Sequence, residues 1–378
     1  MKKHLLLLIL LMACTALIPH AKAQAAEPLK IAGIYSLTGE YADIQVPVLK
    51  GLRFAIEEVN ANGGVLGRQV DLILIDNFST ALGSREAVRI ALDKNVVAVL
   101  GCSLSSHSLA IAPVLQKAGI PMITPESTHS DITKVGNYIF RTCFDDDFQG
   151  LIMAEFARKE LKAATAVVLT NTGNQYSIDL ARSFIKGFKD KKGTILWEGD
   201  FLMGSTDLDA MLSRVKKANP SVIYLPGYVD DSARIIKLAR EKGIEIPFLG
   251  GDGWDDLMFK IAGDALHECF YTVQWHKNST NPHSRAFVKA WEKRFGTVES
   301  AWIAPSYDAV MLLADAIKRA GSTKPSSIRK ALEETNHFKG VTGDITFDAN
   351  RNPVNKPAVI LKFEQGTSHY IKTFSRGK

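Results

Sequence analysis

Short apolar runs alternate with amphipathic stretches along most of the chain. Runs rich in valine, isoleucine and leucine, such as 70–76 and 96–101, predict buried strands. Between them, as in 48–64 and 84–95, apolar residues recur at three- and four-residue spacing, which predicts helices. Strands that are apolar throughout and separated by helices are typical of parallel sheets covered on both faces. The pattern therefore predicts an α/β protein with doubly wound parallel sheets.

The first 23 residues have a different pattern. Lys2 and Lys3 precede an apolar or small stretch of 14 residues from Leu5 to Ile18, and small residues follow at Ala21 and Ala23. These features predict a cleaved secretory signal over 1–23. A membrane-spanning helix needs about 20 apolar residues, so an uncleaved anchor is disfavoured. The segment ending at Cys14 loosely resembles a lipidation motif, and a lipid anchor at Cys14 is the less favoured alternative.

Removal of the signal leaves 378 − 23 = 355 residues, enough for two domains with their own cores. The strand–helix alternation begins at 29–37 and starts again with a helix over 149–161 and a strand over 166–171. After 275 the chain is mostly helical, and we expect these helices to complete the first lobe. The tail alternates as hairpin or edge strands do. The expected lobes are 24–143 with 275–345, and 144–274 with 346–378, the second including the hinge.

Charge and cysteines exclude several classes of protein. The signal carries three lysines and no acids, so its removal lowers the net charge from +6 to +3, too little to indicate nucleic-acid binding. The remaining cysteines, Cys102, Cys143 and Cys269, are odd in number and show no metal or redox spacing, so no metal or cofactor is expected. Cys102 and Cys143 could pair only if the fold brings them together, and we favour the unpaired state.

Catalytic motifs are also missing from the sequence. It contains no phosphate-binding loop, no dinucleotide fingerprint and no zinc-protease motif. The nearest approach to a hydrolase elbow is GCSLS at 101–105, with His107 close by. The nucleophile of an elbow lies between two glycines, whereas Leu104 and Ser106 flank Ser105. His107 on the same turn would not face Ser105 with the geometry that a triad requires. The protein is therefore not expected to be an enzyme.

Ligands of open α/β sheets bind at the carboxyl ends of strands, and polar or aromatic residues follow several predicted strands. Hydroxyls at a helix start suit a carboxylate, while an acid next to glycines suits a cation. Singly, these residues could equally be helix caps, a polar loop, core aromatics and a turn aspartate. Together they match an α-amino acid zwitterion, because burying both of its charges requires a partner for each. The candidates are Ser105, Ser106, Glu126, Thr128, Tyr176, Tyr228, Asp252 and Trp254.

Several of these segments together resemble a known family. The stretches 31–39, 57–68, 101–128, 140–150, 225–231 and 248–255 are similar to the leucine/isoleucine/valine-binding proteins of branched-chain amino acid ABC transporters. The resemblance covers essentially the whole chain after the signal. It implies a type I periplasmic-binding fold, in which two doubly wound lobes are joined by a three-segment hinge and hold the ligand between them. It also implies a periplasmic monomer that delivers an amino acid to a membrane permease and uses no cofactor.

The resemblance also assigns roles to residues. Ser105 and Thr128 would hold the ligand carboxylate; the backbone carbonyl of Glu126, with Thr128 and Asp252, would hold the amine; Tyr176 and Tyr228 would line the wall of lobe two. Three departures leave side-chain specificity open: Glu126 replaces a small residue, Ile44 an aromatic one, and Asp252 a glutamate. The ligand could thus be a branched-chain, other apolar or aromatic amino acid. The alternatives are a carboxylate without an amine and a sensing module, for which we find no signalling segment after residue 23.

Overall fold

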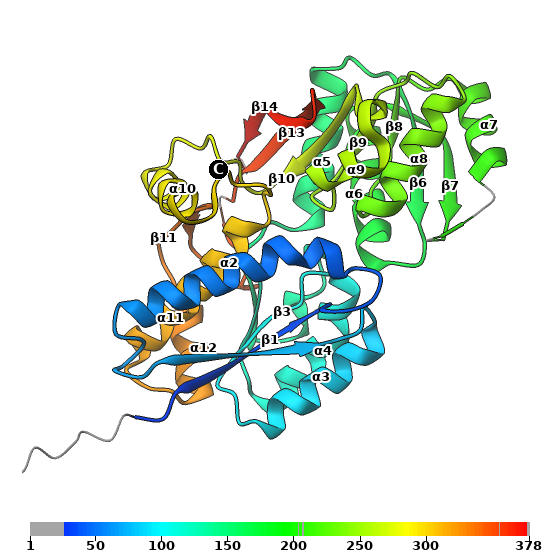
Figure 1. Cartoon of the computed structure of the whole chain (residues 1–378). Helices are drawn as coiled ribbons and strands as arrows, with labels where there is room; N and C mark the ends of the chain where they lie inside the picture. Colours follow the sequence, from blue (N-terminus) through cyan, green and yellow to red (C-terminus); the bar gives the residue numbers. More distant parts are fainter. Residues whose placement is uncertain (1–25, 203, 206–207, 355, 376–378) are drawn as a thin grey trace, which may run out of the picture.

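The computed structural model describes residues 26–202, 204–205, 208–354 and 356–375. Its two larger sheets form two lobes. Figure 1 draws the first sheet in blue to teal and the second mainly in green, with a red edge. The predicted signal and Cys14 lie outside the described residues. Within the described ranges, no helix is both long and apolar enough to cross a membrane.

The first sheet has five strands, all parallel, in the order β2-β1-β3-β4-β5. Each lies within a stretch that the sequence predicts as extended. The fold class is therefore confirmed for this lobe. The strands are β1 (Leu29–Tyr35), β2 (Val70–Asp76), β3 (Val99–Gly101), β4 (Met122–Thr124) and β5 (Ile139–Arg141).

Helices cover both faces of this sheet. Neighbouring side chains on a strand point to opposite faces, and Ile31 and Ala32 accordingly enter two different buried clusters. The Ala32 cluster includes apolar residues of α3 (Ala81–Asp93) and α4 (Ser105–Ala118). The Ile31 cluster includes those of α2 (Ala42–Ala61) and α11 (Ile303–Ala320).

The second sheet has seven strands in the order β14-β13-β10-β9-β8-β6-β7. Its first five strands in sequence are parallel and repeat the spatial order of the first sheet, while β13 and β14 add an antiparallel edge, as the alternating tail predicts. The helices on its two faces are α5 and α6 on one side and α7 and α8 on the other. The bounds are β6 (Thr165–Asn171), β7 (Thr194–Phe201), β8 (Val222–Tyr224), β9 (Phe248–Gly250), β10 (Cys269–Val273), β13 (Ala358–Glu364), β14 (Thr367–Phe374), α5 (Asp146–Lys159), α6 (Gln175–Asp190), α7 (Leu208–Ala218) and α8 (Val229–Glu241).

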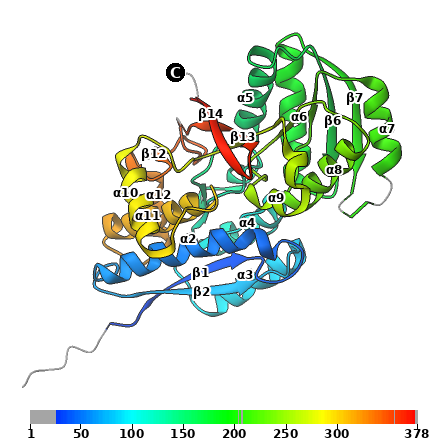
Figure 2. The same cartoon turned by 45° about the horizontal axis from the view of Figure 1, so that its top comes forward.

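The helices after β10 return to the first lobe. Figures 1 and 2 both draw α11 beside α2, and these two helices are in contact along their lengths. The chain thus passes between the two sheets three times: after β5, after β10, and between β12 and β13. The remaining elements are α9 (Phe259–Ala262), α10 (Pro282–Phe295), α12 (Pro325–Glu333), the hairpin β11 (Phe338–Gly340) and β12 (Gly343–Ile345), and 3-10 turns at Thr133–Val135, Asp256–Met258 and Gly263–Leu266.

Helix α2 begins six residues before the predicted start at Val48, at Ala42. Ile44 is buried four residues before Val48, so the apolar face continues through the first turns despite Pro47. This extension matters for the site, because it puts Ile44 and Gln45 on a rigid helix.

The three cysteines of the described residues are free and buried. The structure therefore contains no bond between Cys102 and Cys143. Burial raises the pKa of the Cys102 thiol to about 12, so it remains protonated at neutral pH.

Candidate functional site

A pocket of about 380 Å³ lies where the carboxyl ends of strands from both lobes meet. This volume includes the space at the open mouth of the pocket. The pocket combines apolar walls with a few polar groups. Its lining residues are Ile44, Gln45, Val48, Ser103, Leu104, Ser105, Glu126, Tyr176, Tyr228, Asp252, Gly253 and Trp302. Five of the eight residues proposed from the sequence are therefore brought together here.

The lobe-one wall is built around the start of α4. Ser105 is the first residue of this helix, whose positive end and N–H groups favour an anion. The Ser105 hydroxyl accepts a hydrogen bond from the backbone N–H of His129 (3.2 Å), which ties it to the loop that carries Thr128. This loop offers hydroxyl and backbone groups close to a helix start, a combination suited to a carboxylate.

Thr128 is fully buried but is not itself among the lining residues. Its carbonyl accepts hydrogen bonds from the Arg141 guanidinium (2.8 Å) and from the Asp146 N–H (2.9 Å). Its hydroxyl, by contrast, makes no well-formed hydrogen bond to any of the described residues. The backbone of Thr128 is thus fixed, and its hydroxyl lies beside the buried Asp146 carboxyl, whose pKa it lowers against the larger effect of burial, which raises it.

The lobe-two wall is aromatic and acidic. The rings of Tyr176 and Tyr228 stack with centroids 5.2 Å apart, and the Tyr176 hydroxyl accepts from the Gly253 N–H (2.9 Å). The Asp252 carboxylate accepts from the Gln149 side-chain amide at 2.9 Å. These contacts fix the positions of both tyrosine rings and of the Asp252 carboxylate, so these side chains need little further ordering when a ligand binds.

Two carboxyl groups line the pocket, those of Glu126 and Asp252. Burial raises the pKa of Asp252 to about 7, opposed by hydrogen bonds from Gln149 and Tyr176. Burial also raises the pKa of Glu126 to about 8; the nearby Ser103 hydroxyl lowers it and Asp252 raises it further. No lysine, arginine or histidine is among the lining residues. The described residues also include no group of acids, histidines or cysteines that could hold a metal. The pocket therefore favours a ligand that brings positive charge.

Trp302 is a lining residue that the sequence does not single out. It precedes α11, in the segment that returns to lobe one, and its indole N–H donates to the Asp252 carbonyl (2.8 Å). Because Trp302 is about 50 residues from the nearest motif, only the fold brings it here. Ser103 is the second residue after β3, so the strand-end rule could have included it. Gln45 could have been found only with the correct start of α2.

Besides Thr128, two of the predicted residues do not line the pocket. Trp254 is fully buried in the core of lobe two, where it packs against Tyr271 and Phe363. Trp254 is therefore a core residue, which is the alternative to ligand binding that the sequence leaves open. The Ser106 hydroxyl accepts from the Gln175 N–H at 3.1 Å, so Ser106 joins α4 to α6.

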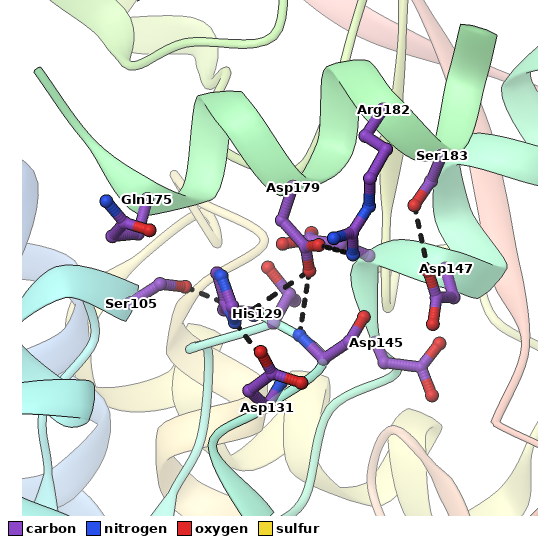
Figure 3. A network of polar contacts seen from close by, with 12 residues as sticks. Ser105, His129, Asp131, Asp145, Asp147, Gln175, Asp179, Arg182 and Ser183 are labelled. Atoms are coloured by element: carbon purple, nitrogen blue, oxygen red, sulfur yellow. Dashed lines mark hydrogen bonds and ion pairs between the residues drawn. The ribbon is translucent and has the colours of Figure 1, made fainter. Parts of the chain in front are cut away.

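Further contacts between the lobes lie next to Ser105, as Figure 3 shows. Asp179 of α6 accepts a hydrogen bond from the Ser130 N–H (2.8 Å) and lies 3.9 Å from Nδ1 of His129. The same carboxylate is paired with Arg182 on its own helix. Asp179 thus connects lobe two to the loop that follows Thr128, and this contact holds the two lobes together beside the pocket.

The raised pKa of Asp252 predicts how stability depends on pH. Between its unfolded and folded pKa values, the folded state holds more protons, so stability falls as pH rises from about 4 to about 7. Asp252→Asn should therefore stabilise the unliganded protein relative to the wild type at pH 8, and much less at pH 4. Thermal melts at the two pH values test this, with the exposed Asp264→Asn as control. An equal effect at both values would contradict the raised pKa.

Comparisons with known proteins agree with this geometry. A family model described as periplasmic binding protein matches residues 28–368. A curated relative, the leucine-, isoleucine-, valine-, threonine- and alanine-binding protein of Pseudomonas aeruginosa, is 29% identical over 86% of this chain and 87% of its own length.

Solved structures are similar over nearly the whole chain. A leucine-binding protein, LivK, from Thermotoga maritima is 35% identical with a TM-score of 0.88, covering 91% of this chain and 98% of that one. The branched-chain amino acid transporter substrate-binding protein LivJ from Streptococcus pneumoniae, in complex with isoleucine, is 29% identical with a TM-score of 0.87, covering 92% and 100%. The two-lobed fold expected from the sequence is therefore confirmed.

Proposed function

Because the chain belongs to the periplasmic binding protein family, we propose that it is an extracytoplasmic receptor that captures an amino acid between its lobes. The observation that carries the proposal is the placement of polar groups on opposite walls of the pocket. An anion-binding helix start on lobe one, at Ser105, faces an acid on lobe two, at Asp252. An α-amino acid carries the two opposite charges that such a pair requires.

In the proposed complex, the ligand carboxylate binds at the start of α4. The Ser105 hydroxyl and the buried Thr128 hydroxyl donate to it, and the helix dipole stabilises its charge. The ammonium pairs with Asp252 and donates to the Glu126 carbonyl. A buried charge is tolerated only when paired and hydrogen-bonded, so this arrangement selects against molecules with one charge alone.

Binding is coupled to closure of the two lobes in this proposal. The ligand has one charge on each lobe, so it stabilises the closed form more than an open one, and it shifts the population by that difference. The contacts of Asp179 and Ser106 across the cleft support such a closed form. The proposed lobes are 24–143 with 275–345, and 144–274 with 346–378. The three chain passages between them act as the hinge.

The relatives support the transport role. The names of the P. aeruginosa and T. maritima proteins both specify amino acid binding, and the S. pneumoniae structure contains isoleucine. By analogy, the exported monomer would deliver its ligand to an ABC transporter permease in the membrane and catalyse no reaction. A carboxylate without an amine is disfavoured, because it would leave Asp252 facing no cation.

A thermal-shift screen of the purified mature protein tests the proposal. The panel contains the proteinogenic amino acids and, as a comparison class, benzoic and other aromatic acids. A true ligand at 100 times its dissociation constant should stabilise the protein by roughly 2.7 kcal/mol. A shift with one or more amino acids and none with the aromatic acids is the expected result. Stabilisation by aromatic acids alone would overturn the amine assignment, and no shift with any compound would overturn the proposed receptor.

A further inference from the structure

The lobe-one side of the pocket contains polar groups that the zwitterion does not use. Three lining residues have buried polar side-chain atoms without a well-formed hydrogen bond among the described residues. They are Gln45, through its side-chain carbonyl, Ser103, through its hydroxyl, and Glu126, through both carboxyl oxygens. The Ser103 hydroxyl lies close enough to the Glu126 carboxyl to lower its pKa, so these two groups form one polar cluster.

These residues come from three separate segments. Gln45 lies on α2, Ser103 follows β3, and Glu126 follows β4. The Glu126 backbone is held nearby: its neighbour Ser127 donates from its backbone N–H to Thr124 (3.0 Å), and the Pro125 carbonyl accepts from Gln274 (3.2 Å). Three segments of the lobe-one backbone thus place polar side-chain atoms at one pocket.

Such groups need partners, because an unpaired buried polar atom costs free energy and buried polar groups are almost always hydrogen-bonded. None of the lining residues is basic, so the pocket walls themselves provide no cation for Glu126. An aliphatic ligand side chain would remove water from these groups and return no hydrogen bond. A ligand side chain with its own donor would replace the lost water with a hydrogen bond.

We infer that Gln45, Ser103 and Glu126 form a side-chain subsite, which selects amino acids whose side chain ends in an N–H or O–H donor. The inference rests on the proposed function and specifies its ligand class. The amide of asparagine or glutamine, the hydroxyl of threonine and the ammonium of lysine share this chemistry. Ile44, Val48, Leu104 and Trp302 provide the apolar surface for the carbon atoms that precede the donor.

The charge of Glu126 distinguishes a neutral ligand side chain from a cationic one. Burial, and to a lesser extent the nearby Asp252, raise the pKa of Glu126 to about 8, so without a cation it is largely protonated at neutral pH. A protonated Glu126 both donates to and accepts from an amide or hydroxyl. A ligand ammonium would instead hold Glu126 ionised and depend on its charge. Glu126→Gln keeps the shape and the neutral hydrogen bonds but removes the charge.

Titration calorimetry with near-isosteric amino acid pairs tests the inference. The pairs are threonine and valine, asparagine and leucine, glutamine and methionine, and lysine and norleucine. In the wild type, the polar member of at least one pair should bind about 10-fold or more tightly than its apolar partner. In Glu126→Ala that preference should shrink about 10-fold or more, while the exposed Glu241→Ala on α8 leaves it unchanged.

The outcomes separate the subsite from the receptor. If the apolar member binds as tightly in every pair, or if Glu126→Ala leaves every ratio within about twofold, the subsite is refuted and the amino acid receptor stands. If no amino acid binds the wild type, both the subsite and the proposed receptor function are refuted. Glu126→Gln identifies the source: loss of the lysine preference alone indicates a cationic ligand, and a preserved amide or hydroxyl preference indicates a neutral one. Should Glu126→Ala fail to fold, the wild-type ratios and Glu126→Gln decide.

Discussion

Asp252→Ala should weaken amino acid binding about 100-fold or more. The substitution leaves the buried ligand ammonium without its anionic partner, and breaking a buried charge pair is among the costliest single changes. The substitution removes the acceptor of the Gln149 amide and of the Tyr176 hydroxyl. Tyr176 keeps its hydrogen bond from the Gly253 N–H, so the lobe-two wall should persist. Titration calorimetry of the mature protein measures the loss, and circular dichroism checks the fold.

The matched control for this change is Asp264→Ala, which removes an exposed acid from the same lobe. It should leave the dissociation constant within about twofold. An unchanged affinity in Asp252→Ala, with the fold intact, would refute the assignment of the amine to this acid.

The double variant Ser105→Ala with Thr128→Ala should also lose about 100-fold or more in affinity. Each hydroxyl is proposed to donate to the ligand carboxylate, and a hydrogen bond to a charged group contributes about 1.5–3 kcal/mol. The Ser105 hydroxyl also accepts from the His129 N–H, so its loss loosens the loop that carries Thr128. Each single variant should lose less than the double one.

The control here is Ser213→Ala on α7, which removes an exposed hydroxyl from a helix distant in sequence. A double variant that binds amino acids as tightly as this control would place the ligand carboxylate elsewhere. A double variant that loses affinity equally for acids with and without an amine would support the assignment.

The strand ends were the most informative part of the sequence. Most of the parallel strands were predicted from their apolar runs, and the rule that ligands bind at strand carboxyl ends led to Ser105, Tyr228 and Asp252. These residues line one pocket because their strands belong to two sheets with the same strand order. The second start of the strand–helix alternation predicted a second sheet, which the structure contains.

Tertiary packing decided the rest. Trp302 lines the pocket only because α11 returns to pack along α2, and no local pattern marks that return. Trp254 follows a strand end as the binding residues do, but its large ring fills the core of lobe two beside Phe363. Gln45 depends on where α2 begins, and helix ends are the least certain feature of a sequence pattern.

A cycle of four titrations tests the central claim, capture of a zwitterion by opposite charges on the two lobes, most directly. The best amino acid from the thermal-shift screen and the same acid without its amine are each titrated into the wild type and into Asp252→Ala. Removing the amine should cost the wild type about 100-fold or more in affinity, and should cost Asp252→Ala far less, because the partner is already gone. Equal affinity of the wild type for the two acids would contradict the account.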